Sequence, residues 1–121
     1  MRALTIIVAT ADAERLRAAL MLAAAQAALG GTATLFLQLD AVALLRPPIA
    51  APRDAAHQDA GLPDLAALLA EAQALGVTLV ACQSGLALWD LTLDMLPKGI
   101  VADGPIGLLT SLTDADRLLF A

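Results

Sequence analysis

The chain has 121 residues, of which 60% are hydrophobic and only 2% aromatic, so we expect one domain, residues 1–121, with a core of Ala, Leu, Val and Ile. Twelve acidic and seven basic residues give a formal net charge of -5. This charge repels nucleic-acid phosphates and anionic lipid headgroups, so we expect no nucleic-acid partner and no membrane partner.

The first part of the chain is typical of a strand, a helix and a second strand. Residues 3–10, ALTIIVAT, form the continuous apolar run of a strand covered on both faces. Asp12 can cap a helix that ends at Gly30, and residues 32–39, TATLFLQL, form the second strand. Because Gly30 and Gly31 interrupt the apolar stretch from 18 to 39, a helix, a turn and a strand are favoured over a membrane span.

A long proline-rich connection follows the second strand. Residues 40–45 are predicted to make a short helical turn, after which Pro47, Pro48 and Pro52 exclude regular structure up to the next helix. A connection of this length inside a compact domain is usually functional or disordered.

The second part of the chain continues the alternation of helices and strands. Pro63 and Gly76 bracket a helix over 63–75. The remaining predicted elements are a strand at 77–81, a helix from Gln83 or Ser84 through Leu96, a strand at 100–102, a helix at 105–112 and a strand at 116–121. This alternation predicts an α/β domain with a mainly parallel sheet and helices on both faces.

The only cysteine, Cys82, directly follows the predicted strand at 77–81 and precedes a helix. Loops and helix N-termini converge beyond the carboxyl ends of parallel strands, so Cys82 is the candidate reactive residue. Unpaired N–H groups at the helix start would stabilise its thiolate, and Gln83 and Ser84 are candidates to line the site. The structural alternative is that Cys82 packs as a small buried hydrophobe.

Three side chains of the proline-rich connection are further candidates for the site. Because this connection leaves the carboxyl end of a strand, Arg46, Arg53 and His57 could approach Cys82 and place positive charge near its sulfur. In the alternative interpretation, His57 is a solvated side chain and the two arginines are surface charges.

Several other kinds of site lack support in the sequence. One cysteine cannot form an intrachain disulfide, and with one histidine it cannot complete a four-ligand zinc site. We therefore expect no metal and a reducing, cytoplasmic location. No nucleotide cofactor is expected, because no GxGxxG or P-loop pattern occurs. Ser84 lacks the GxSxG context of a hydrolase nucleophile.

Four segments follow one another in a distinctive order: ALTIIVAT with the Ala-rich stretch after it, GGTATLFLQLDAVALL, LGVTLVACQSGLALWDL, and LTDADRLLFA at the end. In this order and spacing they resemble the DsrE/DsrF-like family, which includes sulfur-relay proteins. The resemblance covers nearly the whole chain.

The resemblance implies a three-layer α/β/α fold with a five-stranded, mainly parallel sheet, and oligomers such as homotrimers or hexamers that pack through helices. It also implies that Cys82 carries a persulfide, which it receives from a sulfur-donor protein and passes to an acceptor protein. The expected function is therefore that of a small cytoplasmic persulfide carrier or sulfurtransferase acting at Cys82.

Two other functions compete with this interpretation. The first is an oligomeric module that binds a small ligand or a partner, with Cys82 in a structural role. The second is a thiol peroxidase, but no residue beyond Cys82 supplies a means of polarising peroxide. Oligomerisation is also expected from the apolar residues that surround the predicted helices at 18–29 and 86–96.

Overall fold

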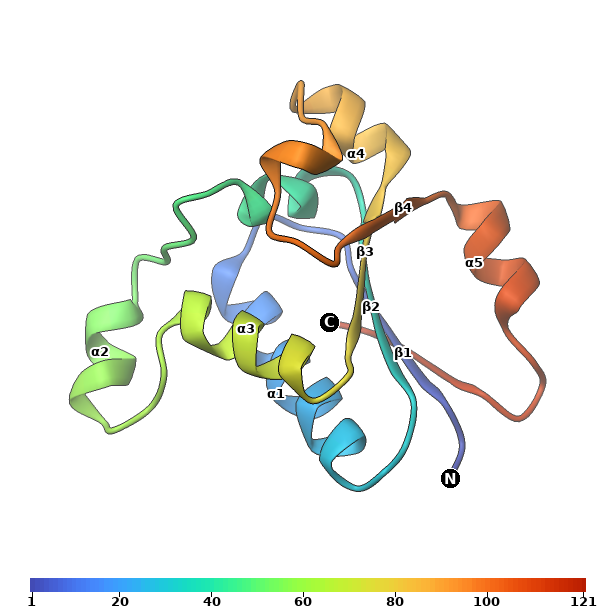
Figure 1. Ribbon diagram of the computed structural model, residues 1–121, viewed down its shortest axis with the longest axis horizontal. Helices are drawn as coiled ribbons and strands as arrows, with labels where there is room; N and C mark the ends of the chain where they lie inside the picture. Colours follow the sequence, from blue (N-terminus) through green and yellow to red (C-terminus); the bar gives the residue numbers. More distant parts are fainter.

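The computed structural model describes residues 1–121 and has the element order β1-α1-β2-η1-α2-α3-β3-α4-η2-β4-α5-β5 (Figure 1). The strands are β1 (Leu4–Val8), β2 (Ala33–Leu37), β3 (Thr78–Cys82), β4 (Val101–Asp103) and β5 (Arg117–Phe120). The helices are α1 (Ala13–Ala28), α2 (Asp54–Asp59), α3 (Leu65–Ala74), α4 (Gln83–Leu88) and α5 (Pro105–Ser111). The 3-10 helices are η1 (Leu39–Leu45) and η2 (Leu93–Met95).

The strands form one five-stranded sheet in the order β4-β3-β2-β1-β5, and every neighbouring pair is parallel. The register places Ile6 of β1 between Leu35 of β2 and Leu119 of β5. All five residues of β1 are buried, which explains why four of them are large and apolar and why apolar and polar residues do not alternate. The predicted α/β class with a parallel sheet is therefore confirmed.

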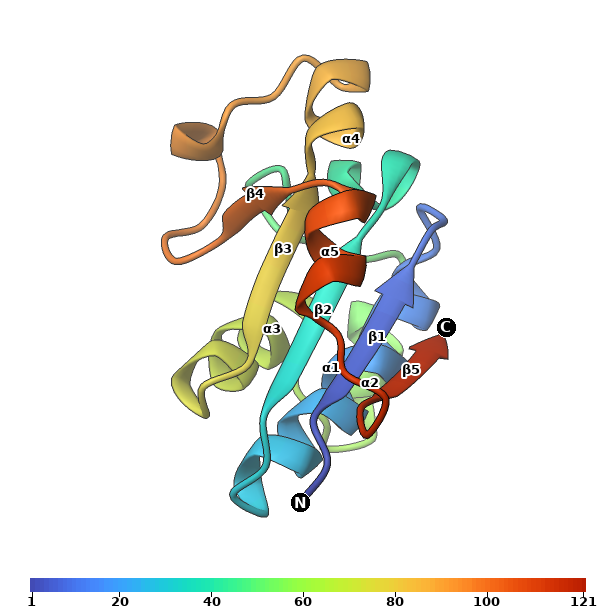
Figure 2. The same cartoon turned by 90° about the vertical axis from the view of Figure 1, so that its right-hand side faces the viewer.

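The two faces of the sheet are covered unequally. Helices α1 and α3 pack side by side on one face, where Leu16, Leu20 and Leu65 are fully buried. On the opposite face only α5 stands over the strands, and Leu108 is the single residue that this helix buries (Figure 2). The predicted three-layer arrangement is present, with a thin second helical layer.

The capping residue predicted for the first helix is confirmed. The Asp12 carboxylate accepts the backbone N–H groups of Glu14 at 2.9 Å and Arg15 at 3.2 Å, which pairs two of the free donors at the start of α1. Gly30 ends the helical turn with a φ of 88°, a conformation that glycine adopts without steric cost.

The proline-rich connection differs from the prediction, because it contains the helix α2 at Asp54–Asp59. None of the residues of α2 is buried. Contacts with α1, a segment distant in the sequence, hold this helix in place. The prolines near α2 predicted irregular structure because these distant contacts cannot be read from the local sequence.

The helix after Cys82 is shorter than predicted: α4 ends at Leu88, and the chain then turns into η2. Asp90 has a φ of 53°, and the N–H of Leu91 donates to the carbonyl of Leu86 at 2.9 Å. This bonding pattern ends a helix with a left-handed residue, a position usually filled by glycine. Because this position holds Asp90 instead of glycine, the sequence lacks the usual signal for the end of a helix. Its apolar periodicity therefore predicted a helix through Leu96.

None of the helices has the length and hydrophobicity that crossing a bilayer requires.

Candidate functional site around Cys82

Cys82 is the last residue of β3 and the N-cap of α4, at the carboxyl edge of the sheet. Its side chain is only 2% exposed. The sulfur nevertheless has two polar partners: Sγ accepts the backbone N–H of Gly85 at 3.1 Å and that of Leu39 at 3.0 Å. Two backbone amides, one from each of two neighbouring segments, are thus directed at the same sulfur atom.

Leu39 reaches the sulfur through an unusual backbone conformation. Its φ is 53°, in the left-handed region that costs a residue with a Cβ atom about 1–2 kcal/mol. The conformation directs the N–H of Leu39 to Cys82 while the Leu39 side chain stays exposed. Local strain of this kind is concentrated at functional sites in proteins.

Gly85 allows α4 to pack directly against η1. A Cβ atom at this position would overlap Cγ2 of Val42 and would lie 2.6 Å from the carbonyl oxygen of Leu39. Only glycine therefore lets both amides, one from each element, reach the same sulfur. The amides of Leu39 and Gly85 were missed by sequence reasoning, although a glycine in the first turn of a predicted helix is a visible signal because it weakens a helix.

The sequence-predicted neighbours of Cys82 lie in two different places. Gln83 and Ser84 begin α4 beside the sulfur, and both are exposed. Arg46, at the end of η1, donates from Nη2 to the carbonyl oxygen of Trp89 at 2.8 Å, which ties η1 to the far end of α4.

Arg53 and His57 belong to α2 and its N-cap, and the structure does not bring them to Cys82. Figure 1 shows α2 at the left of the molecule, well separated from α4 at the top. His57 faces α1 instead, where its Nε2 lies 3.0 Å from Oε2 of Glu14. The prediction that Arg53 and His57 place positive charge near the sulfur is therefore wrong, because both residues lie with α2 beside α1.

A cluster of charged side chains holds α2 against α1. Glu14 accepts the hydrogen bond from His57, and this bond is the main cause of a pKa below the usual range for Glu14. The positive charges of Arg17 and Arg53 lower the same pKa further. The Nε of Arg17 lies 3.5 Å from Oε1 of Glu14 without a hydrogen bond.

Asp54 is the second carboxylate of this cluster. Its Oδ1 accepts Nη2 of Arg17 at 2.7 Å and the N–H of Leu65 at 2.9 Å, and its Oδ2 accepts the N–H of Ala51 at 2.9 Å. These bonds, with that from Arg17 the largest cause, hold the pKa of Asp54 below its usual range. Asp54 thus connects α1, α3 and the proline-rich connection.

Acid should weaken this cluster. Because folding lowers the pKa values of Glu14 and Asp54, their stabilising effect is complete above the ordinary carboxyl range of about 4 and is lost as the pH falls through the lower values of the folded state. We expect the difference in free energy of unfolding between the wild type and Asp54→Asn, measured by urea denaturation, to be constant from about pH 7 to 5 and to shrink toward pH 3. A difference that does not change with pH would contradict this assignment.

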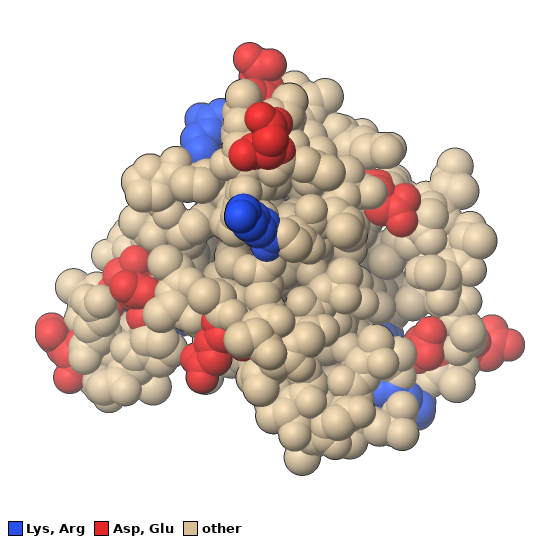
Figure 3. Space-filling model, viewed as in Figure 1, with Lys and Arg blue, Asp and Glu red and all other residues tan.

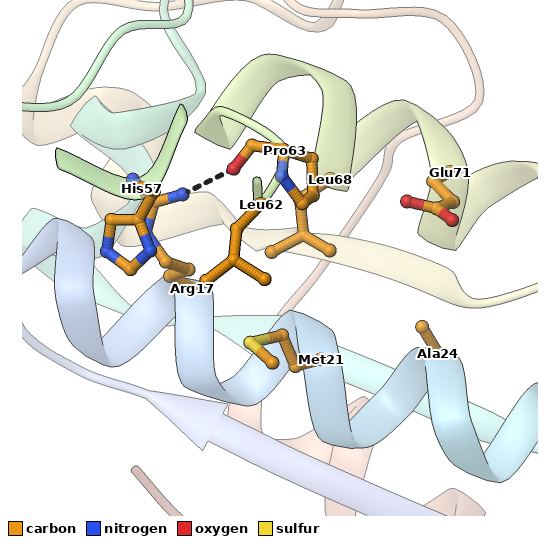
Figure 4. Close-up of a pocket in the computed structure, with 8 residues that line it drawn as sticks. All are labelled: Arg17, Met21, Ala24, His57, Leu62, Pro63, Leu68 and Glu71. Carbon is orange, nitrogen blue, oxygen red and sulfur yellow. Dashed lines mark hydrogen bonds between the residues drawn. The ribbon is translucent and has the colours of Figure 1, made fainter. Parts of the chain in front are cut away.

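A hollow of about 240 Å³ lies between α1 and α3 beside the charged cluster (Figure 4). Arg17 and His57 stand at one end of it, Glu71 stands at the other, and apolar side chains such as Met21 and Leu62 lie between them. Since Arg17 and His57 are bonded to carboxylates, and no cysteine lines the hollow, its residues suit binding or structure rather than sulfur chemistry.

No group of three or more His, Cys, Asp and Glu side chains is arranged to hold a metal ion.

The model of the DsrE/DsrF-like family matches residues 2–120 of the chain. No curated protein matches it. Among solved structures, the ychN protein from E. coli is 20% identical, with each chain covered over 100% of its length and a TM-score of 0.79. MTH1491 from Methanobacterium thermoautotrophicum, titled a protein of unknown function, is 14% identical, with 100% of each chain covered and a TM-score of 0.70. BT1422 from Bacteroides thetaiotaomicron, also titled a protein of unknown function, is 19% identical, with 98% of this chain and 94% of that chain covered and a TM-score of 0.67. At these identities the structures are evidence for the shared fold.

Proposed function

The chain belongs to the DsrE/DsrF-like family, and from the surroundings of Cys82 we propose that it is a persulfide carrier, which accepts one sulfur atom at this residue and passes it on. The observation that carries the proposal is the pair of backbone N–H groups, from Leu39 and Gly85, that converge on Sγ. The neutral thiol of cysteine is a weak acceptor that does not need two amide donors, whereas a thiolate does.

The proposed reaction is an exchange without net oxidation. The Cys82 thiolate attacks the outer sulfur of a donor persulfide, R–S–SH. A new S–S bond forms to Sγ, the S–S bond of the donor breaks, and the donor leaves as the thiolate R–S⁻ with the bonding electron pair. Delivery is the same reaction in reverse order: an acceptor thiolate takes the outer SH group, and Cys82 leaves as the thiolate.

The two amides assist both halves of this exchange. They stabilise the attacking thiolate when sulfur is accepted, and they stabilise the same thiolate as the leaving group when sulfur is delivered. The chain contains no second cysteine, so the loaded residue has no intramolecular thiol that would displace the sulfur as a disulfide. This arrangement suits a carrier with one thiol.

Loading with inorganic tetrasulfide tests the proposal. The Cys82 thiolate and the tetrasulfide dianion should give the Cys82 persulfide and the trisulfide dianion. Intact-mass spectrometry should then show the gain of one sulfur atom, and a reducing agent should remove it. The absence of any adduct with tetrasulfide and with a protein persulfide donor would overturn the proposal.

The burial of Cys82, at 2% exposure, favours a second candidate function, a module that binds a small ligand or partner while Cys82 is structural. In such a module the sulfur serves as the N-cap of α4, and the amides of Gly85 and Leu39 are simply satisfied by it. This candidate predicts that Cys82→Ser leaves binding and assembly unchanged and that alkylating reagents modify Cys82 only on unfolding.

We also propose that the chain forms a homo-oligomer through the thinly covered face of the sheet. Apolar side chains of α5 and the sheet edge are exposed there, with Ile106 at 84% and Phe120 at 71%. We call this area the α5–β5 surface, and its other large members are Leu109 and Leu118. Groups of exposed large apolar side chains usually mark a protein interface.

We expect Phe120→Asp to convert this oligomer to a monomer. Each copy would otherwise have to bury a new, unpaired carboxylate at the apolar contact. Sedimentation velocity at micromolar concentration measures the change. Leu75→Asp, at an exposed leucine that follows α3 on the other helical layer, is the matched control and should leave the mass unchanged. A wild type that sediments as a monomer would contradict the proposal.

A further inference from the structure

A second group of exposed apolar side chains lies around the carboxyl end of the sheet, next to Cys82. Its members are each at least 37% exposed. We call them the α4–η2 surface: Leu39, Leu88, Trp89, Leu93 and Met95. Four of these side chains lie within residues 88–95, and Leu39 comes next to Asp40, which bonds to Trp89. Exposed apolar patches of this kind mark interaction sites.

This surface is bonded directly to the segments that hold the sulfur. The exposed side chain of Leu39 and the amide that donates to Cys82 belong to the same residue. The next residue, Asp40, accepts the indole N–H of Trp89 at 3.2 Å, and Arg46 donates to the carbonyl oxygen of Trp89. A molecule that binds to Leu39 and Trp89 therefore contacts both η1 and the end of α4, the two elements that supply the amide donors.

The border of the surface is mainly acidic. Asp40, Asp90 and Asp94 are exposed, and none of them takes part in an ion pair. Arg46 is the neighbouring cation. Figure 3 shows the acidic side chains in red at the top of the molecule, over α4 and the segment after it, with one basic side chain to their left and another below them. The charges that complement this border are positive.

The same charges disfavour a second copy of the chain as the occupant, although the apolar residues at 86–96 were expected from the sequence to promote oligomerisation. In a twofold contact the patch would lie against itself, so Asp90 and Asp94 would face the same carboxylates of the other copy; in a heterologous ring it would face another surface of the same acidic chain. The net charge of -5 adds to this repulsion at longer range. A partner protein with a basic and apolar contact face is favoured instead.

We infer that the α4–η2 surface is the docking site of the protein that donates sulfur to Cys82, and that this donor presents an apolar contact ringed by Lys or Arg. The inference rests on the proposed persulfide function. Because Cys82 is only 2% exposed, a bulky protein persulfide reaches it only when a docked donor opens a path to the sulfur, whereas a small inorganic polysulfide needs no docking surface.

Two sulfur donors separate the inference from the proposed function. The first is the cysteine desulfurase of the same organism, supplied with cysteine, and the second is sodium tetrasulfide. We expect Leu88→Asp to slow loading from the desulfurase about tenfold or more, as substitutions at interface hot spots do, and to leave loading from tetrasulfide unchanged. Leu75→Asp is the control and should behave as the wild type with both donors. Added salt should slow the loading of the wild type from the desulfurase, because salt screens the attraction between the acidic border and a basic donor.

The outcomes are distinct. Equal desulfurase rates for the wild type and Leu88→Asp would overturn the docking site. So would a lower oligomer mass for Leu88→Asp, because a second copy would then cover the surface. A wild type that loads from tetrasulfide but never from the desulfurase would overturn the docking inference and keep the persulfide function. Failure to load from either donor would overturn both.

Discussion

Cys82→Ser should gain no sulfur from tetrasulfide or from a protein donor, while its fold and melting temperature stay close to those of the wild type. A serine hydroxyl is a good N-cap and can accept the N–H of Gly85 in place of the sulfur, so the start of α4 is kept. Its oxygen cannot form a persulfide. Intact-mass spectrometry measures the loss of loading, and circular dichroism during heating measures the fold.

Gly85→Ala is the companion variant, because it keeps the thiol and disturbs the amide pair. The added methyl group would overlap Val42 and push α4 away from Leu39, at a cost of about 1–3 kcal/mol. We expect a folded protein that loads sulfur about tenfold more slowly, because a preorganised donor that stabilises developing charge is lost, and such donors contribute tenfold or more in acyl transfer. Wild-type loading rates in Gly85→Ala would show that the amides only cap the helix, and sulfur on Cys82→Ser would place the chemistry elsewhere.

The architecture could be predicted because its signals are local. The continuous apolar runs at β1, β2 and β3 are what a sheet covered on both faces needs, and Asp12 and Gly30 mark the ends of the helix between the first two. The position of Cys82 also follows from local pattern, because the end of a buried strand is visible in the sequence.

The surroundings of Cys82 could not be predicted in the same way. The N–H group of Leu39 lies 43 residues before Cys82 in the chain. It reaches the sulfur through a left-handed conformation that the sequence LQLDAV does not indicate. The end of α4 is hidden for a similar reason, since Asp90 takes the place of the expected glycine. The Leu39 donor depends on the contact between η1 and α4, which joins segments that are far apart in the sequence.

The position of α2 is a third case. Arg53 and His57 follow the end of β2, which suggests the carboxyl edge of the sheet, but ion pairs draw their helix toward α1. The decisive residue is Arg17, a charged residue inside the sequence AERLRAALM of a mostly apolar helix. Like Arg15, which is exposed, Arg17 looks like a surface residue until its partner Asp54 is known.

Arg17→Met should therefore be the most destabilising change at a charged residue, with a cost of about 3 kcal/mol in the free energy of unfolding. The Arg17 side chain is only 3% exposed, and it donates to Asp54 at 2.7 Å and to the carbonyl oxygen of Pro63 at 3.1 Å. Methionine fills most of the same space but leaves the carboxylate of Asp54 without its cation. Urea denaturation measures the loss.

Arg15→Met, two residues earlier on α1, is the matched control for this prediction. Arg15 is 58% exposed and lies 3.8 Å from Asp12, so its removal should cost less than about 0.5 kcal/mol. Adding Asp54→Asn to Arg17→Met should recover part of the loss, because the unpaired charge then disappears. If Arg17→Met costs no more than Arg15→Met, the pair with Asp54 does not hold α2 to α1, and the weak apolar contacts of the proline-rich connection must do so instead.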